Sequence, residues 1–152
     1  MAGKKFQFSL QSVLKLRRHE SDTARQALAR TMEARKTQEE RLAEIEARLH
    51  EAAERELQAR RTAPQDFRRL AAYRLELQQA RDRERRSLEQ KRLEEERARH
   101  RLLARRRAEE TLQTLHDEQK MQHEQALQRA ETDLLDEQAL MTHLRTHSSA
   151  GS

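Results

Sequence analysis

The sequence has no cysteine and no tryptophan, and only one proline and two glycines among its 152 residues. Without cysteine, the chain has no disulfides, thiolate metal sites or cysteine nucleophiles. Because glycine and proline are so rare, a fold of many short elements joined by tight turns is excluded. Valine and isoleucine occur once each, which argues against an extensive sheet.

Large apolar side chains are also scarce. Hydrophobic residues make up 34% of the chain, and they include 21 alanines and 21 leucines. A compact globular core draws on a richer composition, and no apolar run approaches the roughly 18 residues that cross a bilayer. Charged residues reach 39%, and the abundance of Ala, Glu, Leu, Arg and Gln is typical of long helices. We therefore expect a soluble, intracellular, all-α protein.

Two long segments without proline or glycine lie on either side of Pro64. From Leu10 to about Arg60, positions in alternating steps of four and three follow the heptad pattern of a coiled coil, with a seam that is apolar at its ends and polar in its middle around Gln38. Proline is tolerated only in the first turn of a helix. The pattern therefore predicts a helix over about 9–60, a turn over 61–65 that contains Pro64, and a helix over about 66–146.

Capping signals support both helix starts. Ser9 can cap the first helix, with Phe8 and Val13 placed for a hydrophobic staple. Thr62 and Gln65 have the spacing of a capping box for the second helix.

Two amphipathic helices joined by a short turn can bury their stripes only against each other, in antiparallel orientation. With the turn centred near Arg61, Leu49 faces Tyr73 and Ile45 faces Leu77. The intervals of 11, 14 and 10 that separate Leu77, Leu88, Leu102 and Leu112 are not pure heptads and predict local changes in supercoiling.

The second helix is longer than the first. We therefore expect an all-α antiparallel coiled-coil hairpin that forms a single domain over residues 1–147. A helical overhang from about residue 117 carries apolar residues that lack an intramolecular partner. Residues 148–152 read as a disordered tail.

The sequence offers no enzymatic machinery. It has no Gly-rich phosphate loop, and carboxylates on a two-helix rod face solvent without a cleft that would shift their pKa. His143 and His147 have metal-binding spacing but no evident third ligand, and we interpret His116 and His123, seven apart, as a polar pair on the helix surface. We expect no enzymatic activity, no catalytic residue, no cofactor and no metal.

The formal net charge of +5 is unevenly distributed. Arg81–Arg107 holds 12 basic and six acidic residues, and a basic segment suggests nucleic-acid contact. However, the acidic residues are threaded through the segment, and no aromatic residue lies there for base stacking. We interpret it as a solvated, salt-bridged face. A nucleic-acid-binding helix and a generic scaffolding coiled coil stay as alternatives.

Two short stretches carry a family resemblance. The first is an apolar pattern around the start of the first helix, formed by Phe6, Phe8, Leu10, Val13, Leu14 and Arg17. The second follows the turn and is formed by Phe67, Tyr73 and Leu77. Both resemble FliJ, the small soluble component of the bacterial flagellar type III export apparatus, or the related stalk protein of virulence-type secretion systems.

The resemblance implies a coiled coil similar to the central stalk of rotary ATPases. In this family the protein inserts into the ring of the export ATPase, FliI, and promotes its assembly and activity. It also contacts the export gate protein, FlhA, and escorts empty export chaperones. The resemblance further implies a cytoplasmic protein, peripheral at the inner face of the cell membrane through the gate alone, without nucleic-acid contact.

The family's gate-binding face maps by resemblance onto eight positions of this chain: Gln38, Leu42, Ile45, Leu49, Tyr73, Leu77, Ala80 and Glu84. Ile45 and Leu49 replace aromatic residues of the family pattern, and Glu84 replaces a histidine. By analogy with rotary stalks, the N-terminal motif and the overhang form the end that enters the ATPase ring.

Overall fold

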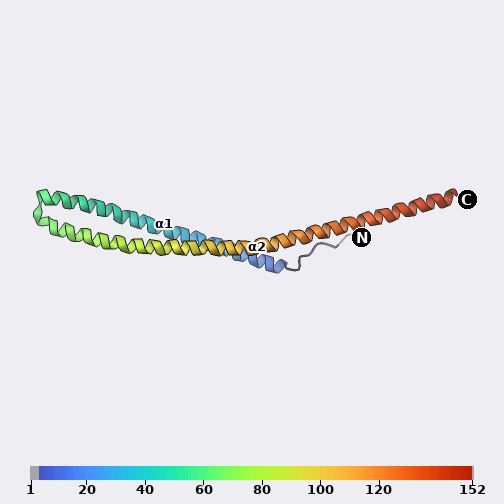
Figure 1. Cartoon of the computed structure of the whole chain (residues 1–152), viewed down its shortest axis with the longest axis horizontal. Coiled ribbons are helices and arrows are strands. Elements are labelled where there is room, and N and C mark those ends of the chain that lie inside the picture. The colour runs from blue at the N-terminus through green and yellow to red at the C-terminus, as the bar shows by residue number, and fades with distance from the viewer. Residues whose placement is uncertain (1–3, 152) are drawn as a thin grey trace. The chain divides into compact units, whose positions relative to one another are not determined.

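The computed structural model describes residues 4–151 and contains two long α-helices joined by a short 3-10 helix. Helix α1 is Gln11–Thr62, η1 is Pro64–Asp66, and α2 is Phe67–Ala150 (Figure 1). No strand occurs in the described part of the chain. The predicted class, two long helices packed as a coiled-coil hairpin, is confirmed.

Pro64 builds the connection between the helices. It occupies the first position of η1, where its missing N–H would have had no helical partner. Ala63 before it has φ −146° and ψ 72°, and no side chain caps η1. Thr62 is still part of α1, and its hydroxyl donates to the Gln58 carbonyl oxygen at 2.8 Å. The predicted capping box is therefore wrong, because the preceding helix uses the Thr62 hydroxyl.

Helix α1 begins slightly later than the capping signal predicted. The backbone N–H of Gln11 donates to the Phe8 carbonyl oxygen at 3.1 Å, and that of Leu14 donates to the Leu10 carbonyl oxygen at 2.9 Å. Leu10 therefore occupies the cap position predicted for Ser9. Residues 4–8 before this turn have no regular secondary structure.

Helix α2 ends later than expected. The hydroxyls of Ser148 and Ser149 each donate at 3.0 Å to a carbonyl oxygen three residues earlier, as serine side chains in a helix often do. Residues 148–150, expected as part of a disordered tail, are thus helical, whereas Ser152 lies outside the described residues.

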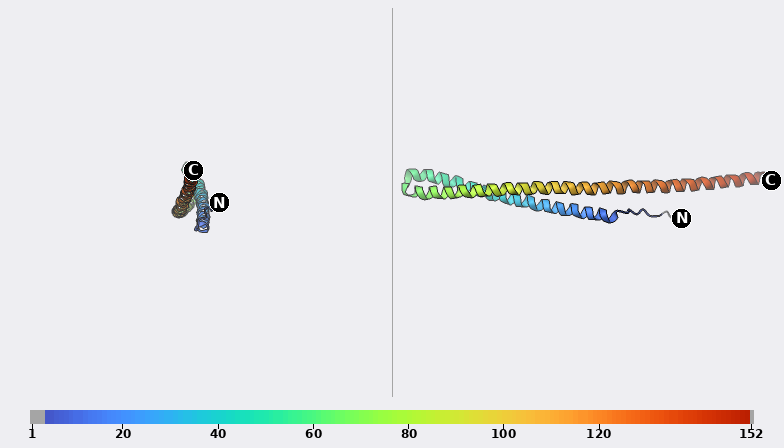
Figure 2. Two further views of the ribbon diagram at one scale, coloured as in Figure 1. Left: turned by 90° about the vertical axis from the view of Figure 1, so that its right-hand side faces the viewer. Right: turned by 60° about the horizontal axis from the view of Figure 1, so that its bottom comes forward.

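The chain divides into two compact units by its internal contacts, and the single domain over residues 1–147 stays a prediction. We call Glu20–Arg105 the turn unit, and Met1–His19 with Arg106–Ser152 the terminal unit. In the turn unit, α1 and α2 run antiparallel and lie side by side next to η1, as the views in Figures 1 and 2 agree.

The core of the turn unit is thin and rich in alanine. Its buried apolar residues are Ala24, Ala52, Ala59, Leu77, Leu88, Ala98 and Leu102. In α1, the buried and half-buried positions continue the predicted steps of four and three, so the predicted seam is confirmed there. Each fully buried leucine contributes only about 2 kcal/mol, so polar contacts across the seam carry an unusual share of the specificity.

The seam of α2 is more regular than its leucines suggested. Buried and half-buried positions follow steps of four and three without interruption from Leu70 to Leu102. The apparent irregularity arose because charged residues such as Arg81 and Lys91 occupy intervening seam positions. The intervals that predicted changes in supercoiling are thus ordinary heptad spacings.

Neither described helix is apolar over a stretch long enough to span a bilayer.

Candidate functional site

The structure places all eight predicted gate-binding residues in the turn unit. Gln38 and Leu77 are buried, and Tyr73 is 43% exposed. The other members are half-buried at the seam: Leu42, Ile45, Leu49, Ala80 and Glu84. Most of this set therefore serves the contact between the two helices, and Tyr73 is its most accessible member.

Gln38 and Glu84 are brought into direct contact. Gln38 is only 4% exposed, and its Nε2 donates to the Glu84 backbone carbonyl oxygen at 3.2 Å and also to the Glu84 carboxylate. A buried amide that found no partner would cost about 1–3 kcal/mol. Gln38 therefore marks the register of the hairpin, as its position in the polar middle of the seam indicated.

Other pairs show where the turn is centred. Arg74 binds Glu56 through two guanidinium nitrogens, and Arg85 lies 3.3 Å from Glu46. Gln38 and Glu84 are centred on residue 61, as predicted, whereas these ion pairs are centred about four residues later, near residue 65. Long side chains reach along the helix axis, so pairs centred on residue 61 and pairs centred near residue 65 occur in the same hairpin.

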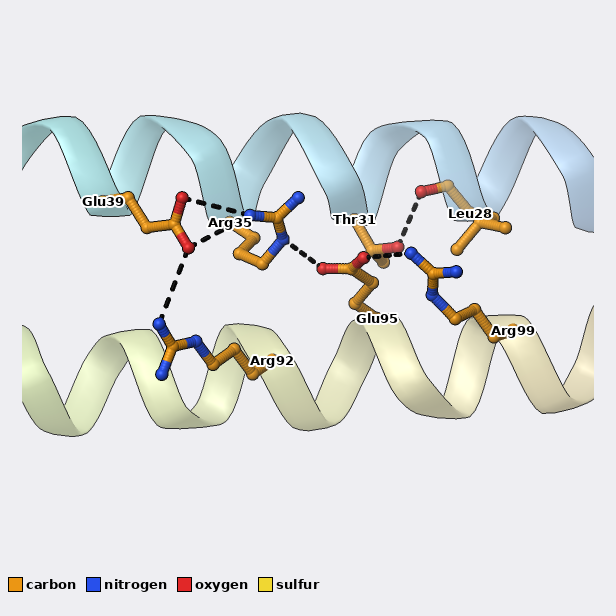
Figure 3. A network of polar contacts seen from close by, with 7 residues as sticks. All are labelled: Leu28, Thr31, Arg35, Glu39, Arg92, Glu95 and Arg99. Atoms are coloured by element: carbon orange, nitrogen blue, oxygen red, sulfur yellow. Dashed lines mark hydrogen bonds and ion pairs between the residues drawn. The ribbon is translucent and has the colours of Figure 1, made fainter.

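A network of charged side chains crosses the seam further from the turn (Figure 3). Glu95 of α2, 6% exposed, accepts from Arg35 of α1 and from Arg99 of its own helix, the latter at 2.8 Å. Arg35 also donates to Glu39 at 3.0 Å, and Arg92 lies 3.6 Å from the same carboxylate. Two arginines from different helices thus hold one buried carboxylate.

These contacts shift the pKa of both central groups. The hydrogen bond from Arg99 contributes most to lowering the pKa of Glu95, burial opposes it, and the hydrogen bond from Arg35 lowers the pKa further. Hydrogen bonds to Glu39 and then to Glu95 raise the pKa of Arg35. Glu95 and Arg35 are therefore charged at neutral pH, and the network acts as a structural clamp.

In the terminal unit, two aromatic residues that precede α1 pack on two histidines of α2. The Phe6 ring lies 5.4 Å from the His116 ring and 5.7 Å from the His123 ring, between ring centroids. Phe8, which is buried, contacts His116 edge-to-face at 5.2 Å. The Nε2–H of His123 donates to the Lys4 backbone carbonyl oxygen at 2.8 Å. Residues 4–8 are therefore fastened along α2.

The predicted N-terminal motif supplies much of this packing. Phe8 and Leu14 are buried, with Leu14 only 1% exposed. Phe6, Val13 and Arg17 are half-buried, and Leu10 is exposed.

In the terminal unit one polar contact joins α1 to α2, and two further polar contacts lie within α2. Arg18 donates to the Gln113 side-chain oxygen at 2.6 Å. His116 Nδ1 lies 3.0 Å from an Asp117 carboxylate oxygen, and Gln113 donates to the same oxygen at 3.0 Å. The His116 contact and then the Gln113 contact lower the pKa of Asp117.

The role of His116 and His123 was missed by sequence reasoning, which interpreted them as surface polar groups. Two features of the sequence could have indicated this role. His116 and His123 are seven residues apart, so they occupy the same heptad position, and Phe6 and Phe8 alternate along the segment before α1. A histidine ring can pack on a phenylalanine ring while its nitrogens bond elsewhere, so a polar residue type concealed a packing role.

The unpartnered part of α2 is shorter than predicted. Residues 117–127 still include half-buried positions, because residues 4–8 lie against α2 there. From residue 128 to residue 150 every side chain is exposed. This stretch includes large apolar residues: Leu134, Leu135, Leu140, Met141 and Leu144.

The exposed apolar residues of this stretch suit contact with a partner protein. The His143 and His147 rings meet edge-to-face with centroids 4.2 Å apart, and no group of three or more metal-ligating side chains occurs within residues 4–151.

The chain is similar to a known protein family over most of its length. The family model described as "Flagellar FliJ protein" matches residues 6–148, which is nearly the whole chain. No curated protein and no solved structure matches the chain. The matched range covers both the N-terminal motif and the eight predicted gate-binding positions.

Proposed function

Because the chain belongs to the flagellar FliJ family, whose members are components of the flagellar export apparatus, we propose that it is the central-stalk protein of that apparatus. In this role it promotes assembly and activity of the FliI ATPase ring, and it links the ring to the FlhA gate and to export chaperones. It acts without catalytic chemistry, in the cytoplasm, and reaches the inner face of the membrane through the gate alone.

One observation supports the ATPase contact above all others: the exposed apolar stretch of α2 over residues 128–150. Leu134, Met141 and Leu144 are spaced by seven and three residues, so they fall on one side of the helix. All three are exposed, and nothing within residues 4–151 covers them. An amphipathic helix with an uncovered apolar face is a common docking element for a partner protein.

The gate contact is proposed for the turn unit. Tyr73 is exposed on α2, and Ile45 and Leu49 on α1 retain partly accessible side chains. In this proposal Gln38 and Leu77 support the face from inside the seam and do not touch the gate protein.

The ATPase contact is tested with the full chain and purified FliI. Replacing Leu134, Met141 and Leu144 together by serine removes the apolar face of the exposed stretch. We expect the concentration of this protein that gives half-maximal ATPase stimulation to rise at least about tenfold, since apolar anchors at an interface often contribute more than 1 kcal/mol each.

The matched control replaces Thr132 and Ala139 by serine on the opposite side of the same stretch, and it should stimulate like the unmodified chain. Full stimulation by the triple variant at unchanged concentration would show that this stretch does not enter the ring.

A further inference from the structure

We propose that the end of the turn unit carries a separate docking surface for an acidic protein segment with one large apolar anchor residue. The surface surrounds Leu57 and Phe67, where α1 gives way to η1 and α2. It contains none of the eight residues assigned to the gate, so it stands independently of the proposed function.

The surface is hollowed around apolar side chains. An open hollow of about 230 Å³ is lined by Ala53, Glu56, Leu57, Arg60, Phe67 and Arg74. A second hollow of about 350 Å³ shares Leu57 and Arg60 and adds Gln58 and Arg61. The first is smaller than the roughly 300–1,000 Å³ of small-molecule sites, but it suits a single large side chain of a partner.

Leu57 is the apolar feature that stands out. Its side chain is 64% exposed on the last turns of α1, and it lines the first hollow together with half-buried Phe67. Interface hot spots commonly consist of such an apolar contact in a pocket surrounded by polar residues. A partner side chain that inserts next to Leu57 and Phe67 therefore removes apolar surface from water on both sides.

The segment that carries the surface is strongly basic and only partly neutralised. Residues 55–74 contain six arginines, one glutamate and one aspartate. Glu56 is bonded to Arg74, and Asp66 lies 4.0 Å from Arg69. The other four arginines are Arg55, Arg60, Arg61 and Arg68, and none has a carboxylate partner among residues 4–151.

Arg60 links the charge to the hollow. Its Cζ lies 5.4 Å from the centroid of the Phe67 ring, which holds the guanidinium over the apolar floor and leaves its N–H groups without a carboxylate. Guanidinium groups bind carboxylates in a bidentate manner. An apolar pocket with free guanidinium groups around it is therefore complementary to an apolar residue flanked by Asp and Glu.

The same features disfavour nucleic acid as the occupant. Phe67 is half-buried and covered by Arg60, so it does not offer a free face for base stacking. Leu57 has no role in phosphate recognition, whereas a peptide anchor uses it directly.

The test measures fluorescence anisotropy of a labelled peptide rich in Asp and Glu with one central leucine, titrated with the full chain. Its partner probe has serine in place of that leucine, and a duplex DNA of mixed sequence is the third probe. We expect saturable binding of the leucine peptide, at least about tenfold tighter than the serine peptide. DNA should not compete at equal concentration.

Two variants locate the binding. Leu57→Ser should weaken the leucine peptide to the level of the serine peptide, and the double change Arg61→Glu, Arg68→Glu should weaken both peptides at least about tenfold. The matched controls are Leu93→Ser and the double change Arg83→Glu, Arg86→Glu, which alter exposed residues of α2 that line neither hollow. They should change the affinity less than about twofold.

Far-UV circular dichroism confirms that each variant keeps its helix content. The proposal is overturned if the leucine peptide does not bind, if both peptides bind equally, or if the charge control weakens binding as much as Arg61→Glu, Arg68→Glu. Displacement of the peptide by DNA would assign the surface to nucleic acid and overturn it as well.

Discussion

Glu95 is the residue at which burial and charge oppose each other most directly. A carboxylate enclosed in a seam is costly unless arginines pair with it, and here Arg99 and Arg35 do so. Because the folded pKa of Glu95 is lowered, the group stabilises the fold above its unfolded pKa. That contribution is lost as the pH falls through the folded pKa.

We predict that Glu95→Gln lowers the free energy of unfolding at pH 7 by about 2 kcal/mol. This is below the 3–5 kcal/mol for a fully buried pair because Arg99 is half-exposed to water. Between about pH 5 and pH 3, the unmodified chain should lose more stability than the variant. Urea unfolding followed by circular dichroism at both pH values measures the two differences.

Glu96→Gln is the control, because Glu96 is exposed and its change should stay within about 0.5 kcal/mol. The double change Arg35→Leu, Glu95→Leu should restore or exceed the original stability, since an apolar pair can replace a buried ion pair. Equal loss for Glu95→Gln and Glu96→Gln would contradict the clamp role of the network.

At the scale of elements, residues 4–8, which precede α1, pack against α2. Phe6 and Phe8 contact His116, and Lys4 accepts a hydrogen bond from His123. Segment 4–8 therefore extends the contact between the two ends of the chain past the first residue of α1.

We predict that Phe8→Ala frees this segment. The change removes a buried ring, and even half of the 3–5 kcal/mol typical of a core Phe→Ala change exceeds the energy needed for about tenfold more opening. Limited proteolysis with trypsin should therefore cleave after Lys4 and Lys5 about tenfold faster, because local opening limits cleavage of a packed segment.

Gln7→Ala, which alters the exposed residue between the two aromatic rings, should leave the cleavage rate within about twofold. If Phe8→Ala and the unmodified chain were cleaved at the same rate, the packing of the two phenylalanines would contribute nothing to holding the segment.

At the scale of the whole molecule, the central question is whether the seams are satisfied within one chain. In the turn unit, Gln38, Glu56 and Glu95 each bond to a residue on the other helix of the same chain. A generic scaffolding coiled coil would pair the same seams with a second copy. Because these seam residues are already bonded within one chain, pairing of the seams with a second copy is disfavoured.

We predict a mass of 18.1 kDa by sedimentation equilibrium, without doubling at micromolar concentration. Leu77→Asp, which places a charge in the buried seam, should lose helix content and several kcal/mol of stability. Leu75→Asp is the matched control, since Leu75 is exposed two residues away. A mass of two chains that falls to one in Leu77→Asp would favour the scaffolding alternative.

Sequence and structure each decided a definite part of this picture. The scarcity of Gly, Pro and β-branched residues and the steps of four and three specified two long helices, one connection at Pro64 and the seam of α1. Local pattern is enough for these features because helix formation and seam position depend on neighbours within a few residues.

The sequence could not show which polar residues lie inside. Glu95, His116 and Arg81 read as surface residues, and only partners distant in the chain bring them into the packing. The same applies to the hollow beside Leu57, which exists because Phe67 returns to α1 after the turn and Arg60 covers its ring. Periodicity determined the helices and where they turn. The pairing of residues tens of positions apart, which only the folded chain contains, determined which surfaces stay free.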